Sequence, residues 1–205
     1  MTRSIDRLAL ASGLLWMVGA ALTPWVGIWT GIAGVGLGLG LVCLLRAPAL
    51  LAPLFRPTPR GLGLGLLAAG VMVAGTYGVY PLLAARFTLF GAGVPPLYAA
   101  FREGRPSWVV LLLPLVIVAE EVVWRGIVYD ALRRRLGPVA AVAAAGAAYA
   151  LAHAPARSLV LTLVALGCGL FWSALREATG SLVPSTLSHL VWDLLVMLWW
   201  PLAGP

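Results

Sequence analysis

The stretch that decides the fold runs from Val109 to Arg125 and reads VVLLLPLVIVA–EE–VVWR, with Glu120 and Glu121 directly after the apolar run. An ionised carboxylate in the centre of a bilayer costs about 3 kcal/mol or more, so acids inside membrane helices persist where they pair with another group or do chemistry. The apolar run predicts a membrane helix. The two acids indicate that this helix carries a functional site.

The composition of the whole chain agrees with a membrane location. Of its 205 residues, 61% are hydrophobic and 10% are charged, and the mean hydropathy is +0.98. Soluble domains carry about 25% charged residues. The composition therefore predicts an integral membrane protein.

Helix lengths give the number of crossings. A helix needs about 20 residues to cross a bilayer, and this length predicts seven spans at 8–23, 26–45, 61–83, 108–132, 138–153, 158–175 and 182–200. We therefore expect an all-α, polytopic membrane protein with about seven transmembrane helices. It forms one membrane-embedded domain, 1–205, with N-terminal helices and a loop in 1–106 and a polar core in 107–200. Residues 1–22 also fit a signal peptide, but we expect the first helix to be retained.

The basic residues predict the orientation. All 14 are arginines, and the net charge is +7. With a cytoplasmic N-terminus, nine arginines fall in inside loops and four in outside loops, which favours this orientation. Because the arginines are scattered over short loops, we expect no nucleic-acid partner. Trp25, Trp29, Trp108, Trp199 and Trp200 then lie near the outer interface. The two cysteines are expected to be buried hydrophobes.

Three pairs of polar residues share a four-residue spacing, which places each pair on one face of a helix. They are Glu121 with Arg125, Tyr149 with His153, and His189 with Asp193, and the two histidines are the only ones in the chain. The charges of Glu121 and Arg125 can neutralise one another. Glu120 is rotated by about 100° from Glu121, so we expect it to face a cavity.

These groups suit the hydrolysis of an amide. A carboxylate and an imidazole on facing helices can activate a water molecule, and a second imidazole can stabilise an oxyanion. Asp193 can fix the tautomer of His189. His153 alone is also compatible with an interfacial role, and the His189–Asp193 pair with a polar contact between helices.

The three pairs resemble the motifs of a known family. Glu120-Glu121-Val-Val-Trp-Arg125 matches the E-E-x-x-x-R motif of the CPBP family, the CaaX-protease and bacteriocin-processing membrane proteins also called Abi. Tyr149-Ala-Leu-Ala-His153 and His189-Leu-Val-Trp-Asp193 resemble the family's second and third motifs. The motifs follow in the family's order, so the chain is identified as a member with a CPBP-type helical core.

The resemblance implies a glutamate-dependent intramembrane endopeptidase that works without a catalytic metal or other cofactor. It implies that Glu120 is the general base that activates water and that His153 assists it. It also implies that His189, with Asp193 beside it, stabilises the oxyanion. Glu121, Arg125 and Tyr149 support the architecture. The prenyl-protein members usually have asparagine in place of Asp193, and an ionised aspartate cannot donate to an oxyanion.

The substrate expected from the resemblance is a protein with a C-terminal segment near the membrane. The short chain looks bacterial and is expected in the inner (plasma) membrane as a multi-pass protein, and bacterial relatives such as the myxosortases remove C-terminal sorting tails. Two alternatives remain open. One is a zinc-dependent protease of the prenyl CaaX type, with His153, His189 and carboxylates as ligands. The other is a bacteriocin-immunity or scaffold protein without enzymatic activity.

Overall fold

The fold is a bundle of helices, seen in a computed structural model that describes residues 2–103 and 109–203. The described residues contain no strand. The elements in chain order are α1 (Thr2–Val26), η1 (Trp29–Gly34), α2 (Val35–Arg46), α3 (Pro48–Leu51), η2 (Ala52–Phe55), α4 (Pro59–Arg86), α5 (Thr88–Arg102), α6 (Val109–Glu121), η3 (Val122–Val128), α7 (Tyr129–Arg133), α8 (Pro138–His153), η4 (Ala154–Ala156), α9 (Leu159–Thr179), α10 (Val183–Trp192) and η5 (Asp193–Trp199). Three of these, η1, η3 and η5, are π-helices.

The predicted all-α membrane fold is confirmed. Five helical segments in the described part of the chain are long and apolar enough to cross a membrane: Arg3–Val26, Trp29–Arg46, Pro59–Arg86, Pro138–Ala156 and Leu159–Thr179. Two further predicted spans correspond to the continuous run α6–η3–α7, which carries the glutamates, and to the shorter run α10–η5. The chain is thus a multi-pass membrane protein.

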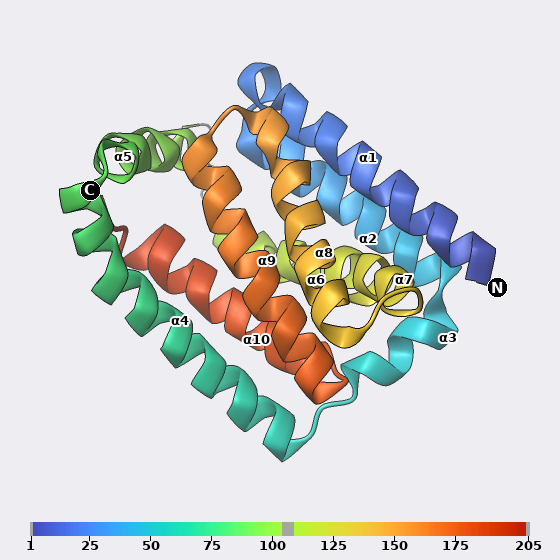
Figure 1. Ribbon diagram of the computed structural model, residues 1–205. Coiled ribbons are helices and arrows are strands. Elements are labelled where there is room, and N and C mark those ends of the chain that lie inside the picture. Colours follow the sequence, from blue (N-terminus) through green and yellow to red (C-terminus); the bar gives the residue numbers. More distant parts are fainter. Residues whose placement is uncertain (1, 104–108, 204–205) are drawn as a thin grey trace.

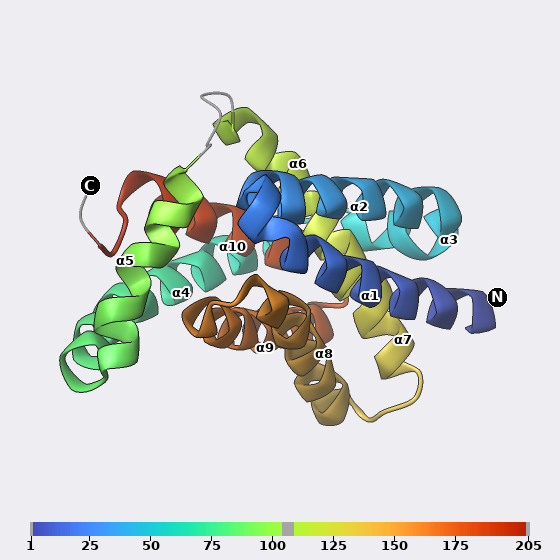
Figure 2. The same cartoon turned by 90° about the horizontal axis from the view of Figure 1, so that it is seen from above.

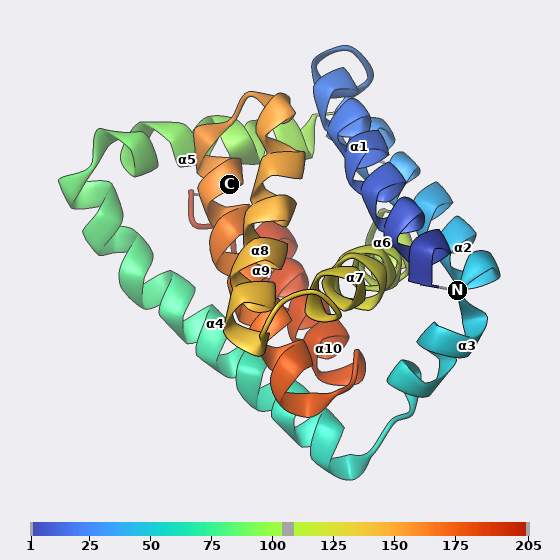
Figure 3. The same ribbon diagram turned by 45° about the vertical axis from the view of Figure 1, so that its right-hand side comes forward.

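The helices associate in pairs around a buried centre. In Figures 1 and 2, α1 lies beside α2, α8 beside α9, and α4 beside α10. Figure 3 shows α6 and α7 between the α1–α2 pair and the group of α8, α9 and α10. All seven residues of η3 are buried. The segment that directly follows the two glutamates therefore lies at the centre of the molecule.

Several helices begin or end at residues that are typical of helix boundaries. Thr58 caps α4 through a hydrogen bond from the Gly61 amide, with Pro59 in the first helical position, and Ser158 caps α9 in the same way. Both are favoured cap residues, because a side-chain oxygen accepts a backbone amide that has no partner within the helix. Gly180 ends α9 in the left-handed conformation, which glycine adopts at little cost.

Two boundaries differ from the sequence prediction, and proline is the reason in both. The first helix was expected to end at Thr23-Pro24 but continues to Val26. The segment around Pro95-Pro96 was expected to be a loop but forms α5. Membrane helices tolerate proline because neighbouring groups satisfy the backbone that it leaves unpaired.

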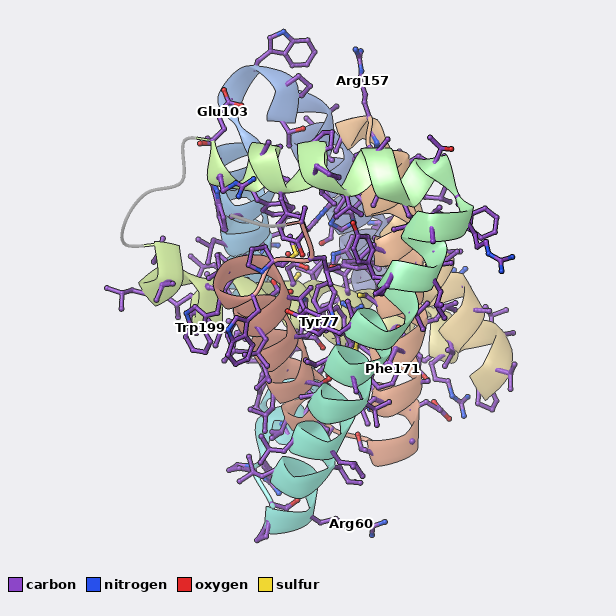
Figure 4. All side chains as sticks on the ribbon, turned by 90° about the vertical axis from the view of Figure 1, so that its left-hand side faces the viewer. Arg60, Tyr77, Glu103, Arg157, Phe171 and Trp199 are labelled. Carbon is purple, nitrogen blue, oxygen red and sulfur yellow. The ribbon has the colours of Figure 1, made fainter. Side chains whose placement is uncertain are left out.

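Helix α5 differs from the other long helices in its direction. Figure 4 shows it lying across the upper ends of the bundle, at the end where Arg157 is found and opposite Arg60. It contacts α4 and α9. Its Tyr98 hydroxyl donates a 2.7 Å hydrogen bond to the Val196 carbonyl of η5. We call α5 the roof of the bundle.

Candidate active site

Glu120 lies at the end of α6 and is 7% exposed. The Tyr149 hydroxyl of α8 donates a 2.7 Å hydrogen bond to Glu120 Oε2. One carboxylate oxygen is thereby fixed by the second motif. The other oxygen remains available to a molecule in the neighbouring cavity.

Glu121 is fully buried and connects the first motif to the third. Its Oε1 lies 3.2 Å from Arg125 Nη1 and 3.0 Å from His189 Nδ1. The guanidinium stays charged in proteins, so a carboxylate in contact with it is ionised. His189 Nδ1 must then be the donor toward Glu121, because an ionised carboxylate only accepts.

Aromatic rings pack against both Arg125 and His189. The Arg125 guanidinium lies 4.5 Å from the centre of the Tyr149 ring and 5.1 Å from that of Trp172. The His189 ring stacks on Trp172, with centroids 3.7 Å apart and planes tilted by 23°. Cation–π contacts of desolvated groups stabilise by about 2 kcal/mol. The rings therefore help to hold charge in an apolar interior.

Asp193 lies beside His189 without fixing its ring. Asp193 Oδ1 is 3.7 Å from His189 Nε2, which is too long for a hydrogen bond. The partner within hydrogen-bond range is Glu121, at the other ring nitrogen. The orienting role that the spacing suggested for Asp193 thus belongs, in this arrangement, to Glu121.

His153 has both ring nitrogens engaged. Nδ1 lies 2.8 Å from the Tyr149 carbonyl oxygen one turn earlier in α8. Nε2 lies 3.3 Å from the indole nitrogen of Trp16, which donates to it. Trp16 comes from the middle of α1 and is 1% exposed.

Trp16 was not among the site residues predicted from the sequence. Tryptophan is enriched at membrane interfaces, and Trp16 lies in the centre of a span instead. Its position in the span could have marked Trp16 as unusual. It could not have predicted His153 as its partner, because 137 residues separate the two.

A cavity of about 360 Å³ brings the predicted site residues together. Its polar lining includes Glu120, Tyr149, His153, His189 and Asp193. Glu121 and Arg125 lie outside it, in the wall behind. The rest of the lining is mostly apolar and includes Val94, Leu97, Tyr98 and Phe101 of the roof helix α5. The cavity therefore offers a few polar groups to an otherwise apolar occupant.

The side chains do not fit a zinc site in this arrangement. Among residues 2–103 and 109–203, no three His, Cys, Asp or Glu side chains are grouped so that they could hold a metal ion. Three of the four imidazole nitrogens already contact other groups of the protein. The expectation of a reaction without a cofactor stays a prediction.

Comparison with known families adds an independent observation. Residues 102–195 match the family model described as type II CAAX prenyl endopeptidase Rce1-like. This match agrees with the resemblance of the three motifs to the CPBP family. The matched segment contains all seven site residues predicted from the sequence. No curated protein and no solved structure matches the chain.

The match covers slightly less than half of the chain. The family model describes CAAX prenyl endopeptidases, which are peptide hydrolases. The matched segment begins at the end of α5. Trp16 lies outside it, as do α1, α2 and α4.

Proposed function

We propose that this chain is a glutamate-dependent intramembrane endopeptidase that cuts a peptide bond in the C-terminal tail of exported or membrane-anchored proteins. The observation that carries the proposal is the shared cavity: Glu120, His153 and His189 come from three helices and line one largely apolar space of about 360 Å³. A cavity of this kind suits a peptide segment that leaves the bilayer.

The first step assigned to Glu120 is the activation of water. Tyr149 donates to one oxygen of Glu120, which leaves the other to accept a proton from a water molecule. The hydroxide oxygen forms a bond to the scissile carbonyl carbon. The carbonyl electron pair moves onto its oxygen. When the C–N bond breaks, the proton held by Glu120 passes to the leaving amine, which restores the carboxylate.

His189 is the group assigned to the oxyanion. Its Nδ1 donates to Glu121, so a proton on Nε2 as well makes the ring an imidazolium. Glu121 on one side and Asp193 on the other, at 3.7 Å, favour that charge. An Nε2–H facing the cavity can then donate to the developing oxyanion. In this role Asp193 supports the donor and need not donate itself.

Two features support access from the side of the bundle covered by α5. A second hollow of about 700 Å³ lies there, between the α1–η1 turn, α5 and the start of α9. It shares the lining residues Ile28, Leu97, Val160 and Leu161 with the cavity. The arginine distribution predicts that this side faces the outside of the cell, where exported proteins are found.

The proposal is tested by mass spectrometry of native protein C-termini. Cells that express wild-type protein are compared with cells that express Glu120→Gln at equal levels. The amide is nearly isosteric and still accepts from Tyr149, so the fold is kept. Glu177→Gln is the matched control, because Glu177 pairs with Arg133 at the surface, away from the cavity.

A set of proteins that keeps its C-terminal tail only in the Glu120→Gln cells supports the proposal and names the substrates. Identical termini in all three strains contradict it and favour the immunity or scaffold alternative. The zinc alternative is separated by metal analysis of the purified protein. About one zinc ion per chain, together with inhibition by chelators, favours that alternative.

A further inference from the structure

Trp16 joins the N-terminal helix to the candidate active site. Its ring is 1% exposed and lies edge-to-face against Trp124, with centroids 5.5 Å apart. On the other side α2 approaches so closely that a Cβ on Gly36 would lie 2.9 Å from the Trp16 ring. The ring is thus held from two sides, and its N–H is directed at His153 Nε2.

The contacts of His153 leave one tautomer. A carbonyl oxygen only accepts hydrogen bonds and an indole nitrogen only donates them. Nδ1, which faces the Tyr149 carbonyl, therefore carries the proton. Nε2, which faces the Trp16 N–H, carries the lone pair. The ring is a neutral imidazole whose single lone pair is occupied by α1.

We propose that Trp16 is a positioning residue for His153, holding it as the Nδ1–H tautomer in a fixed ring orientation within the catalytic cavity. The reactive role of His153 rests on the proposed function; the tautomer does not. One consequence is that α1 is part of the active site, although it lies outside the Rce1-like segment. A second is that both ring nitrogens of His153 are engaged in this arrangement, so a water molecule reaches Nε2 only by taking the place of the Trp16 N–H.

The first test is nitrogen NMR of the protein labelled with ¹⁵N-histidine in lipid nanodiscs. The chain has two histidines, so four ring-nitrogen signals report the whole set. We expect wild-type His153 to show a protonated Nδ1 and an unprotonated, hydrogen-bonded Nε2. A protonated Nε2 in the wild type overturns the proposal without any variant.

The second test removes only the donor. Trp16→Phe keeps an aromatic ring and deletes the N–H, so we expect the His153 Nε2 signal to move toward that of a free lone pair while the His189 signals stay. Trp199→Phe is the control of the same chemical change, since Trp199 is 59% exposed and lines neither the cavity nor the second hollow. The Nε2 signal should not move in Trp199→Phe. An unmoved signal in Trp16→Phe contradicts the inference.

Measurements of kcat and KM then distinguish a positioning role of Trp16 from a purely structural packing role. We expect Trp16→Phe to lower kcat by about fivefold to tenfold, the factor that one buried hydrogen bond of ordinary strength represents. KM should stay at the wild-type value, and Trp199→Phe should keep both constants. A shifted NMR signal with an unchanged kcat overturns the positioning role. If the wild type cleaves nothing, the proposed function fails, and the NMR comparison still decides the tautomer.

Discussion

At the scale of single residues, two neighbouring glutamates have different surroundings. Glu120 lines the cavity and accepts a hydrogen bond from Tyr149, a neutral donor. Glu121 lies behind the cavity wall and contacts two cationic or potentially cationic groups, Arg125 and His189. The same side chain is thus placed for chemistry at one position and for charge balance at the next.

This difference predicts that replacing glutamate by glutamine changes the stability of the fold at position 121 but not at position 120. Glu121→Gln leaves Arg125 buried without its counter-charge, and breaking a buried ion pair in this way costs about 3–5 kcal/mol of stability. Glu120→Gln removes no ion pair, so its unfolding temperature should stay close to that of the wild type. Thermal unfolding of both variants in the same detergent measures this. Equal destabilisation of the two would contradict the assignment.

At this scale the sequence predicted contacts within one helix better than contacts between helices. The four-residue spacing places Glu121 beside Arg125, and the structure has that contact at 3.2 Å. The same spacing suggested Asp193 as the partner of His189, whereas the closer partner is Glu121, 68 residues away in the chain. Helical periodicity carries no information on which faces meet, so this contact and that of Trp16 required the structure.

At the scale of helices, length and hydrophobicity were sufficient to locate the segments. The predicted spans 138–153 and 182–200 correspond to α8 and to α10–η5, within a residue or two. The roof helix α5 was missed because Pro95-Pro96 and the flanking arginines are typical of loops. The π-helices were not predicted either, although η3 and η5 carry Arg125 and Asp193. Such segments are frequent at functional sites.

One glycine determines how closely α2 approaches α6, the helix that ends with Glu120 and Glu121. A Cβ on Gly40 would lie 2.5 Å from Ala119 Cβ and 2.7 Å from Ala119 Cα. Because backbone cannot yield as a side-chain tip does, α2 and α6 must separate, and Glu120 follows Ala119 in the chain. We expect Gly40→Ala to lower stability by about 1–3 kcal/mol and to reduce activity.

The matched control lies on the same helix. Gly38 has no atom within 4 Å of an added Cβ, so Gly38→Ala should leave stability and activity at the wild-type level or slightly above, as alanine favours helix. Unfolding in detergent and cleavage assays compare the pair. If both variants behave alike, close contact between α2 and α6 is not what Gly40 provides.

At the scale of the whole molecule, interhelical contacts bring the predicted cytoplasmic segments to one end. Asp6 pairs with Arg134 and Arg135, which joins the N-terminal end of α1 to the loop before α8. The Leu54 carbonyl accepts from the Leu182 amide, which joins the linker before α4 to the start of α10. Trp29, at the opposite end, donates to the Phe101 carbonyl of α5. Trp108 and Arg105 lie outside the described residues.

This arrangement and the arginine distribution together predict the topology. With the arginine-rich end in the cytoplasm, the C-terminus and the roof helix face outward. A cysteine added after Pro205, in a background with both native cysteines replaced by serine, should react with a membrane-impermeant maleimide on intact cells. A cysteine placed in the 133–136 loop should react only after lysis. The reverse pattern would invert the topology and exclude exported tails as substrates.

The proposed function depends most on the chemistry of Glu120, and one rate constant tests that chemistry. The measurement is kcat of the purified protein in nanodiscs on a peptide that spans a cleavage site found in cells, for wild type, Glu120→Gln and Glu177→Gln. Loss of the general base predicts a fall of about 10²–10⁴-fold in Glu120→Gln, with Glu177→Gln equal to wild type. A Glu120→Gln protein that cleaves at the wild-type rate would contradict the role of Glu120 as the general base.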